Sequence, residues 1–368
     1  MPKDALTRRR FGSLLALGGV AAAAAPATAC AAARTPATPP DPRPRAAGAG
    51  ARPPLLKPRH LSPGDTVGLV LPASLAFEAS TVDLARQQLE ALGFRVKVGA
   101  HAHARHGYLA GTDAERAADL NTMFADPEVA GIFCFRGGWG TPRLLPLLDF
   151  ATIRKNPKPF VGYSDITALL NAIHQETGLV TFHGPIAASN LRPFNREGLG
   201  RVVMSNEPIG TLRNPEKEED ELVPRSYRIV TLAPGQCRGR LVGGNLTLVA
   251  SLMGTPWEVD TEGAILLLED VEEEYYRIDR MLSQLALGGK LARVAGVVFG
   301  YCTDCPVGDG PSFSLEEILG QYFGSLGVPA MAGLAFGHRE KMLTLPIGLP
   351  ATLDAAAGTL SFDEAAVT

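Results

Sequence analysis

Beyond the first sixty residues, short apolar runs alternate with amphipathic segments, and this alternation limits the fold more than any other feature of the chain. The run at residues 66–73 is almost wholly apolar, as a buried parallel strand is. Residues 81–92 follow with apolar side chains on one helical face, and Gly93 ends that helix before a second strand at residues 94–98. This order predicts a βαβ unit with two parallel strands.

The alternation continues and predicts an open parallel sheet with helices between its strands. The expected strands are residues 131–135 and 159–163, and the expected helices are residues 113–125, 142–148 and 165–175. Ligands of such sheets bind beyond the carboxyl ends of the strands. The glycine-rich segment at residues 136–140 and the hydroxyl of Ser164 both follow strand ends, so we expect the ligand site there.

Ser164 lies at a predicted strand-to-helix corner, where its hydroxyl is a candidate nucleophile if an acid and an imidazole activate it. The surrounding sequence matches only part of the G-x-S-x-G nucleophile elbow, because Ile166 stands where the second glycine is expected. Serine is also a frequent helix cap, and the isolated motif is more often a cap than a nucleophile.

Two glycines could complete such a site. Gly137 and Gly138 lack a Cβ, so their backbone N–H groups can approach a ligand closely. The N–H groups of Gly138 and Asp165 could together hold an oxyanion beside Ser164. An ordinary glycine-rich turn explains the same residues, and the segment alone does not choose between these interpretations.

The second half of the chain supplies an acid and an imidazole. A polar stretch at residues 191–236 is interpreted as an interdomain crossover. Glu269 ends a strand predicted at residues 264–270, and His338 follows another apolar stretch. Considered singly, Glu269 is interpreted as a solvated acid in a turn, and His338 is more often a structural histidine than a catalytic one. With Ser164 they complete the set that a Ser-His-acid triad requires. Helices at residues 275–287 and 316–326 and a strand at residues 294–300 continue the alternation.

The amino terminus is interpreted as an export signal and a tether. Residues 1–29 place three arginines before a short apolar run with an A-x-A cleavage pattern, which resembles a twin-arginine signal peptide. Cys30 follows in a weak lipobox, so lipidation and simple cleavage both stay open. Residues 30–58 are a Pro/Ala-rich tether. We expect an exported protein, periplasmic or on the outer face of the cytoplasmic membrane, with no membrane contact except through a lipid on Cys30.

The composition of the chain argues against nucleic acid as a partner. The formal net charge of −3 comes without a basic stripe, so we expect no nucleic-acid binding. A chain of 368 residues with 46% hydrophobic side chains is long enough for two domains.

Seven segments, in order over residues 60–350, carry a resemblance to a known family. They are residues 108–113, 136–140, 162–165, 181–185, 243–246, 268–270 and 337–338. The set is similar to the LD-carboxypeptidase family, serine peptidases of the muramoyltetrapeptide carboxypeptidase and microcin-immunity type. One departure is Trp139, where a tyrosine is usual in the family.

The resemblance implies a flavodoxin-like parallel-sheet domain at residues 59–190 with the nucleophile, and a swivelling-type α/β domain at residues 237–368 with both partners, the active site lying in the cleft between them. It implies that Ser164 attacks, His338 relays the proton and Glu269 orients His338, with the N–H groups of Gly138 and Asp165 as the oxyanion hole. It also implies a homodimer and no cofactor.

The family reaction is hydrolysis of the L,D amide bond between a diamino acid and terminal D-Ala in murein tetrapeptide, so murein peptides are the expected partner. Arg136 or Arg339 could bind the terminal carboxylate, and a surface ion pair is an equal alternative for either. Two other functions stay open. They are a microcin-immunity-like hydrolase of peptidyl-adenylates and a murein-peptide-binding lipoprotein without catalysis.

The remaining histidines and cysteines give weaker signals. His101 and His103 lack an expected carboxylate partner, so a solvated loop is favoured over a metal site, and we expect no metal. Cys302 and Cys305 have C-x-x-C spacing and are interpreted as a local disulfide or two free thiols. His183 is expected to have a structural role.

Overall fold

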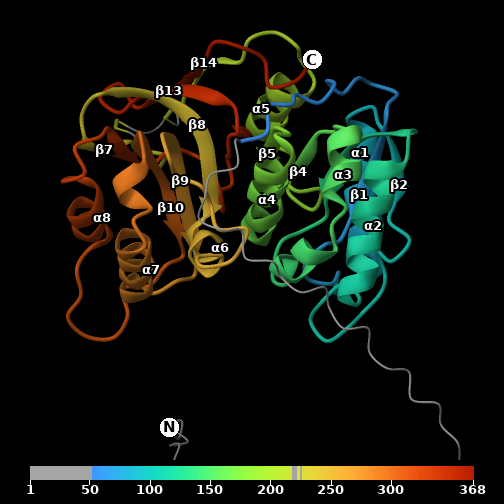
Figure 1. The fold of residues 1–368 in the computed structure, drawn as a ribbon, viewed down its shortest axis with the longest axis horizontal. Coiled ribbons are helices and arrows are strands. Elements are labelled where there is room, and N and C mark those ends of the chain that lie inside the picture. Colours follow the sequence, from blue (N-terminus) through green and yellow to red (C-terminus); the bar gives the residue numbers. More distant parts are fainter. Residues whose placement is uncertain (1–51, 218–221, 224–225) are drawn as a thin grey trace, which may run out of the picture. The chain divides into compact units, whose positions relative to one another are not determined.

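The computed structural model describes residues 52–217, 222–223 and 226–368, and it contains two sheets. The predicted signal peptide, Cys30 and most of the predicted tether lie outside the described residues. One sheet has six strands in the order β12-β5-β4-β3-β1-β2, and the other has eight in the order β6-β14-β13-β8-β9-β10-β11-β7. Figure 1 shows helices α1 to α4 with the strands of the first sheet, and α6 to α8 with those of the second. The predicted two-part α/β architecture is confirmed.

The first sheet has five parallel strands and one antiparallel edge strand. The parallel strands are β1 (Thr66–Val70), β2 (Arg95–Val98), β3 (Val129–Cys134), β4 (Phe160–Gly162) and β5 (Thr181–His183). The edge strand β12 (Leu345–Ile347) comes from the far end of the chain and pairs with β5. Its helices are α1 (Ala79–Ala91), α2 (Asp113–Ala125), α3 (Phe150–Lys155) and α4 (Thr167–Thr177). A capping box between Thr112 and Glu115 begins α2.

The second sheet has a parallel centre with antiparallel strands on both sides. The parallel strands are β8 (Gln236–Asn245), β9 (Ala264–Val271), β10 (Gly296–Thr303) and β11 (Ala330–Ala332). The antiparallel strands are β6 (Gly210–Leu212), β7 (Val230–Ala233), β13 (Pro350–Asp354) and β14 (Thr359–Phe362). The helices of this half are α5 (Pro193–Val203), α6 (Leu246–Ser251), α7 (Tyr275–Leu287) and α8 (Leu315–Phe323).

Several elements differ from the expectation. The segment expected as a helix at residues 142–148 is a 3-10 helix, η1 (Thr141–Leu147), because Pro146 inside it removes a backbone donor. The stretch interpreted as a crossover, residues 191–236, contributes α5, β6 and β7. The second half also returns one strand, β12, to the first sheet. Among the helices that the structure describes, none combines the length and the apolar character that a membrane crossing requires.

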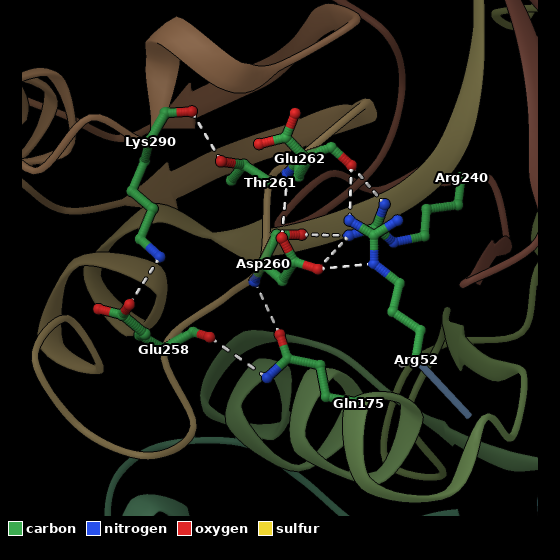
Figure 2. Close-up of polar contacts among 8 residues, drawn as sticks. All are labelled: Arg52, Gln175, Arg240, Glu258, Asp260, Thr261, Glu262 and Lys290. Carbon is green, nitrogen blue, oxygen red and sulfur yellow. Dashed lines mark hydrogen bonds and ion pairs between the residues drawn. The ribbon is translucent and has the colours of Figure 1, made fainter. Parts of the chain in front are cut away.

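Apolar and polar contacts join the two halves. One buried cluster includes Val161 and Leu170 of the first half together with Leu241 and Leu267 of the second. A polar network also ties the end of α4 to the loop before β9 (Figure 2). There Gln175 accepts a hydrogen bond from the Asp260 N–H at 2.8 Å.

Candidate active site

The structure brings the three residues expected as a triad into contact. Ser164 follows β4, Glu269 lies near the end of β9, and His338 lies in the loop between β11 and β12. The distance between His338 Nε2 and Ser164 Oγ is 3.0 Å. On the other side of the ring, His338 Nδ1 lies 2.7 Å from Glu269 Oε2. Both distances are within hydrogen-bond range, so the imidazole bridges a hydroxyl and a carboxylate.

The backbone at Ser164 is in the left-handed region, with φ of +65°, which a non-glycine residue rarely adopts. Such strain concentrates at functional sites. The missing second glycine of the elbow also has a structural explanation. A Cβ on Gly162 would lie 2.7 Å from Cγ2 of Ile166, so the turn needs its glycine at 162 and fills the space with the buried Ile166 side chain.

The glycine loop lies directly against the serine. A Cβ on Gly137 would come within 3.0 Å of Ser164 Oγ, and Gly138 has φ of +117° with no room for a side chain beside Ser74. Within the described residues, the N–H groups of Gly138 and Asp165 donate no hydrogen bond to the protein. Two free N–H groups beside a serine hydroxyl can donate hydrogen bonds to a negatively charged oxygen.

Glu269 is fully buried and its carboxylate is held from several sides. Oε2 accepts a second hydrogen bond from the His338 backbone N–H at 3.3 Å, and Asn245 Nδ2 donates to Oε1 at 3.4 Å. Gly337 passes so close that a Cβ there would lie 2.2 Å from Oε2. Burial acts to lower the pKa of His338, but the hydrogen bond and charge of Glu269 outweigh it, so the pKa is raised from its ordinary value of 6.5.

The structure adds groups that the sequence did not assign to the site. Asn245 begins α6 and also donates to Asp270 at 3.0 Å. The Tyr163 ring meets His338 edge-on at 5.0 Å. His183 is fully buried, and neither of its ring nitrogens has a partner among the described residues. Burial lowers its pKa to about 4, so the ring is neutral. In the sequence, His183 belongs to the segment 181–185 that carries the family resemblance, but that segment does not indicate that the ring is unpaired.

The weaker candidates lie elsewhere. His101 Nδ1 lies 2.7 Å from Asp119 Oδ1, so a carboxylate does lie beside this histidine, contrary to the expectation. Within the part of the chain that the structure describes, no group of three or more potential metal ligands forms. Cys302 and Cys305 are free thiols. The hydrogen bond that the Cys302 thiol donates to Cys305, together with burial, raises the pKa of Cys302.

Comparison with known proteins assigns the family. Residues 67–184 match the LD-carboxypeptidase N-terminal domain, and residues 238–353 match the LD-carboxypeptidase C-terminal domain. The chain belongs to the LD-carboxypeptidase family. It is therefore a carboxypeptidase enzyme, and its two halves correspond to the two domains of that family.

Relatives of this LD-carboxypeptidase family member extend over most of its length. It is 44% identical over 309 residues to the probable murein peptide carboxypeptidase of Bacillus subtilis, covering 82% of this chain and 93% of that one. The muramoyltetrapeptide carboxypeptidase structure from Oxalobacter formigenes has a TM-score of 0.70 at 30% identity, covering 82% and 98%. The microcin self-immunity protein MccF, in complex with aspartyl sulfamoyl adenosine, has a TM-score of 0.78 at 27% identity, covering 85% and 100%.

Proposed function

We propose that this enzyme hydrolyses the amide bond between the L-centred diamino acid and the terminal D-Ala of murein tetrapeptide, through a Ser-His-Glu triad and an acyl-enzyme. The observation that carries the proposal is the hydrogen-bond chain from Ser164 through His338 to Glu269, with distances of 3.0 and 2.7 Å. The names of the Bacillus and Oxalobacter relatives support the choice of substrate.

The reaction begins when His338 Nε2 takes the proton of Ser164 Oγ while that oxygen attacks the scissile carbonyl carbon. The carbonyl oxygen becomes an oxyanion, and the N–H groups of Gly138 and Asp165 donate to it. His338 then gives its proton to the departing amine of D-Ala as the C–N bond breaks. An ester between Ser164 and the tripeptide remains, and a water molecule that His338 deprotonates hydrolyses it.

Glu269 has two tasks in this scheme. Its Oε2 accepts from His338 Nδ1, which fixes the tautomer that leaves Nε2 free to accept the serine proton. Its negative charge stabilises the imidazolium that forms in both steps. Because the carboxylate is fully buried, little water screens this interaction.

The test is mass spectrometry of products from tetrapeptides that contain either meso-diaminopimelate or L-Lys, with wild-type enzyme and Ser164→Ala. We expect D-Ala release by the wild type alone, at a rate at least about 10³-fold above the variant. A brief quench should also reveal the wild-type chain carrying the added mass of the tripeptide acyl group. Binding of tetrapeptide without any release would favour a non-catalytic binding protein instead.

A second candidate is hydrolysis of peptidyl-adenylates, which the structural likeness to MccF favours. The catalytic groups would be the same, and only the acyl donor would differ. An aminoacyl sulfamoyl adenosine, which resembles such a donor, separates the two candidates. Strong inhibition of D-Ala release by this compound would favour the second function, and no inhibition would favour the first.

We also propose export by the twin-arginine route with removal of residues 1–29. The three arginines and the apolar run that follows them support this proposal. Replacing Arg8, Arg9 and Arg10 with lysine should retain the protein in the cytoplasm of a host whose twin-arginine pathway is active. The mass of the mature amino terminus would distinguish a lipidated Cys30 from a free one, and light scattering would test the homodimer.

A further inference from the structure

An arginine beside the triad is held between two tyrosine rings. The Cζ atom of Arg339 lies 5.0 Å from the ring centroid of Tyr227 and 4.5 Å from that of Tyr301. The two rings are 6.1 Å apart and meet at 78°. Cation–π contacts with two rings restrain the planar guanidinium.

The charge of this arginine has no partner within the described residues. No hydrogen bond or ion pair of the guanidinium occurs there, and its buried Nε lacks an acceptor. The buried hydroxyls of Tyr301 and Thr303 are likewise without a partner. Buried polar atoms in folded proteins are nearly always paired, so the unpaired Nε of Arg339 and the unpaired hydroxyl of its contact Tyr301 indicate a place for a polar ligand.

This cluster adjoins the catalytic pair. Arg339 follows His338 directly, and its N–H donates to the Gly337 carbonyl at 2.8 Å, within the loop that passes against the Glu269 carboxylate. Tyr301 precedes Cys302 on β10, which pairs with Asp270 next to Glu269 on β9. The ring that supports the guanidinium and the loop that carries it therefore flank the Glu269–His338 pair.

We infer that Arg339 binds the terminal carboxylate of the substrate, an inference that rests on the proposed function. His338 protonates the departing amine, and in an α-amino acid only one carbon separates that amine from the carboxylate. The carboxylate therefore lies on the His338 side of the scissile bond. A guanidinium recognises a carboxylate through two parallel N–H···O bonds, and an internal peptide bond offers no such group. This contact restricts cleavage to the chain end.

Arg136 is the competing assignment. It lies on the glycine-loop side of the serine, and its Cζ is 5.4 Å from the ring of Phe77, a side chain that is 71% exposed. Water therefore reaches the ring on which this guanidinium lies, which weakens any ion pair that Arg136 forms. Arg136 thus serves as the matched comparison for Arg339.

The experiment compares a tetrapeptide acid with its C-terminal amide in wild type, Arg339→Gln and Arg136→Gln. We expect the wild type to prefer the acid by about 10²-fold or more in kcat/KM, because the amide cannot accept a charge-assisted pair of hydrogen bonds. Arg339→Gln should lose most of that preference through a higher KM for the acid, with the amide changed less than about threefold. Arg339→Lys, which keeps the charge without the fork, should be intermediate.

Calorimetric binding of the same two peptides to Ser164→Ala, with and without Arg339→Gln, separates recognition from catalysis. Weaker acid binding only in the double variant supports the inference even if the wild type releases no D-Ala, which would contradict the proposed function alone. Unchanged acid preference in Arg339→Gln, or its loss in Arg136→Gln instead, would overturn the inference while D-Ala release stands. Circular dichroism and thermal melting check that each variant is folded.

Discussion

The two polar regions where the halves of the chain meet differ in how completely their groups are paired. In the network of Figure 2, Asp260 forms ion pairs with Arg52 at 2.8 Å and with Arg240 at 2.9 Å, and Lys290 pairs with Glu258 at 3.0 Å. Around His338, by contrast, His183 and Arg339 have buried nitrogens without partners among the described residues. The paired groups of the first region connect the two halves, whereas the unpaired groups of the second are those that a bound ligand would pair with.

This contrast separates groups that hold the halves together from groups that act on a ligand. A network of paired groups contributes to stability, and its loss should lower the free energy of unfolding. Unpaired buried groups and the strained Ser164 cost stability and are retained at functional sites. Substitutions in the two regions should therefore affect different measurements, and four predictions test this.

The largest effect is expected for Glu269→Gln. The amide keeps the shape of the side chain but loses the charge that stabilises the His338 imidazolium and selects its tautomer. We expect kcat to fall by about 10³- to 10⁴-fold with little change in the midpoint of urea unfolding. Stopped assays of D-Ala release at pH 8 would measure it.

Asp270→Asn is the matched control for that prediction. Asp270 is the neighbouring acid on β9, but it accepts from Thr247 at the start of α6 and not from His338. Its substitution should lower kcat by less than about tenfold. Equal losses in the two variants would contradict the assignment of Glu269 as the acid of the triad.

Asp260→Asn should act on stability. The carboxylate faces the guanidinium groups of Arg52 and Arg240, and the Arg240 side chain is only 14% exposed, so an unpaired cation would remain partly buried. We expect a loss of about 1–3 kcal/mol in the free energy of unfolding, measured in urea, with kcat/KM within about threefold of wild type. A large fall in kcat/KM with unchanged unfolding would remove the distinction between the two regions.

His183→Leu should change how stability depends on pH. Burial lowers the folded-state pKa of His183 to about 4 from an ordinary 6.5, so between these values the unfolded chain binds a proton that the folded chain does not. Stability from this group is therefore present above pH 6.5 and is lost as the pH falls. As the pH falls from 6.5 to about 4, the free energy of unfolding of the variant should rise relative to that of the wild type by up to about 1.4 kcal/mol per pH unit.

The pH dependence of stability has to be compared between wild type and His183→Leu, because other groups titrate in the same pH range. Burial raises the pKa of Asp165 and of Asp270 to about 6, and these carboxyls bind protons more readily in the folded state. They stabilise the fold as the pH falls through that value and oppose the histidine. Parallel curves for wild type and His183→Leu would show that the ring is not held neutral.

The smallest effect concerns the pH profile of activity. Despite burial, Glu269 raises the pKa of His338, and the reaction needs neutral imidazole, so kcat/KM should fall on acidification through a midpoint above 6.5. In Glu269→Gln the residual activity should have a lower midpoint, because burial then acts without the opposing charge. An unchanged midpoint would mean that another group controls the acid limb.

The sequence predicted the parallel halves well because their strands and helices carry strong local periodicity. Residues 113–125 and 275–287 form helices with the expected bounds. It also named the serine, the acid and the imidazole, because Ser164 and Glu269 lie at or beside strand ends and all three residues match family segments. Short antiparallel strands such as β6 and β12 escaped prediction, because three residues carry too little periodicity and their pairing partners lie far away in the chain.

The environment of each functional group was less accessible to sequence reasoning. Whether Arg339 pairs with an acid or lies between two rings depends on Tyr227 and Tyr301, which are separated from it by many residues. The pairing of His101 with Asp119 has the same origin, since a turn and a helix meet only in the folded chain. Contacts of this kind follow from tertiary packing and leave no local pattern.

The position of β12 late in the chain has a consequence for protein synthesis. It lies seven residues beyond His338 and completes the sheet that carries Ser164. A nascent chain that ends before residue 347 lacks the complete strand β12, which pairs with β5 at the edge of the first sheet. The loop that carries His338 is then also not held in its final position. Under the proposed function, the chain should therefore gain hydrolytic activity only after residue 347 has been synthesised and β12 has paired with β5.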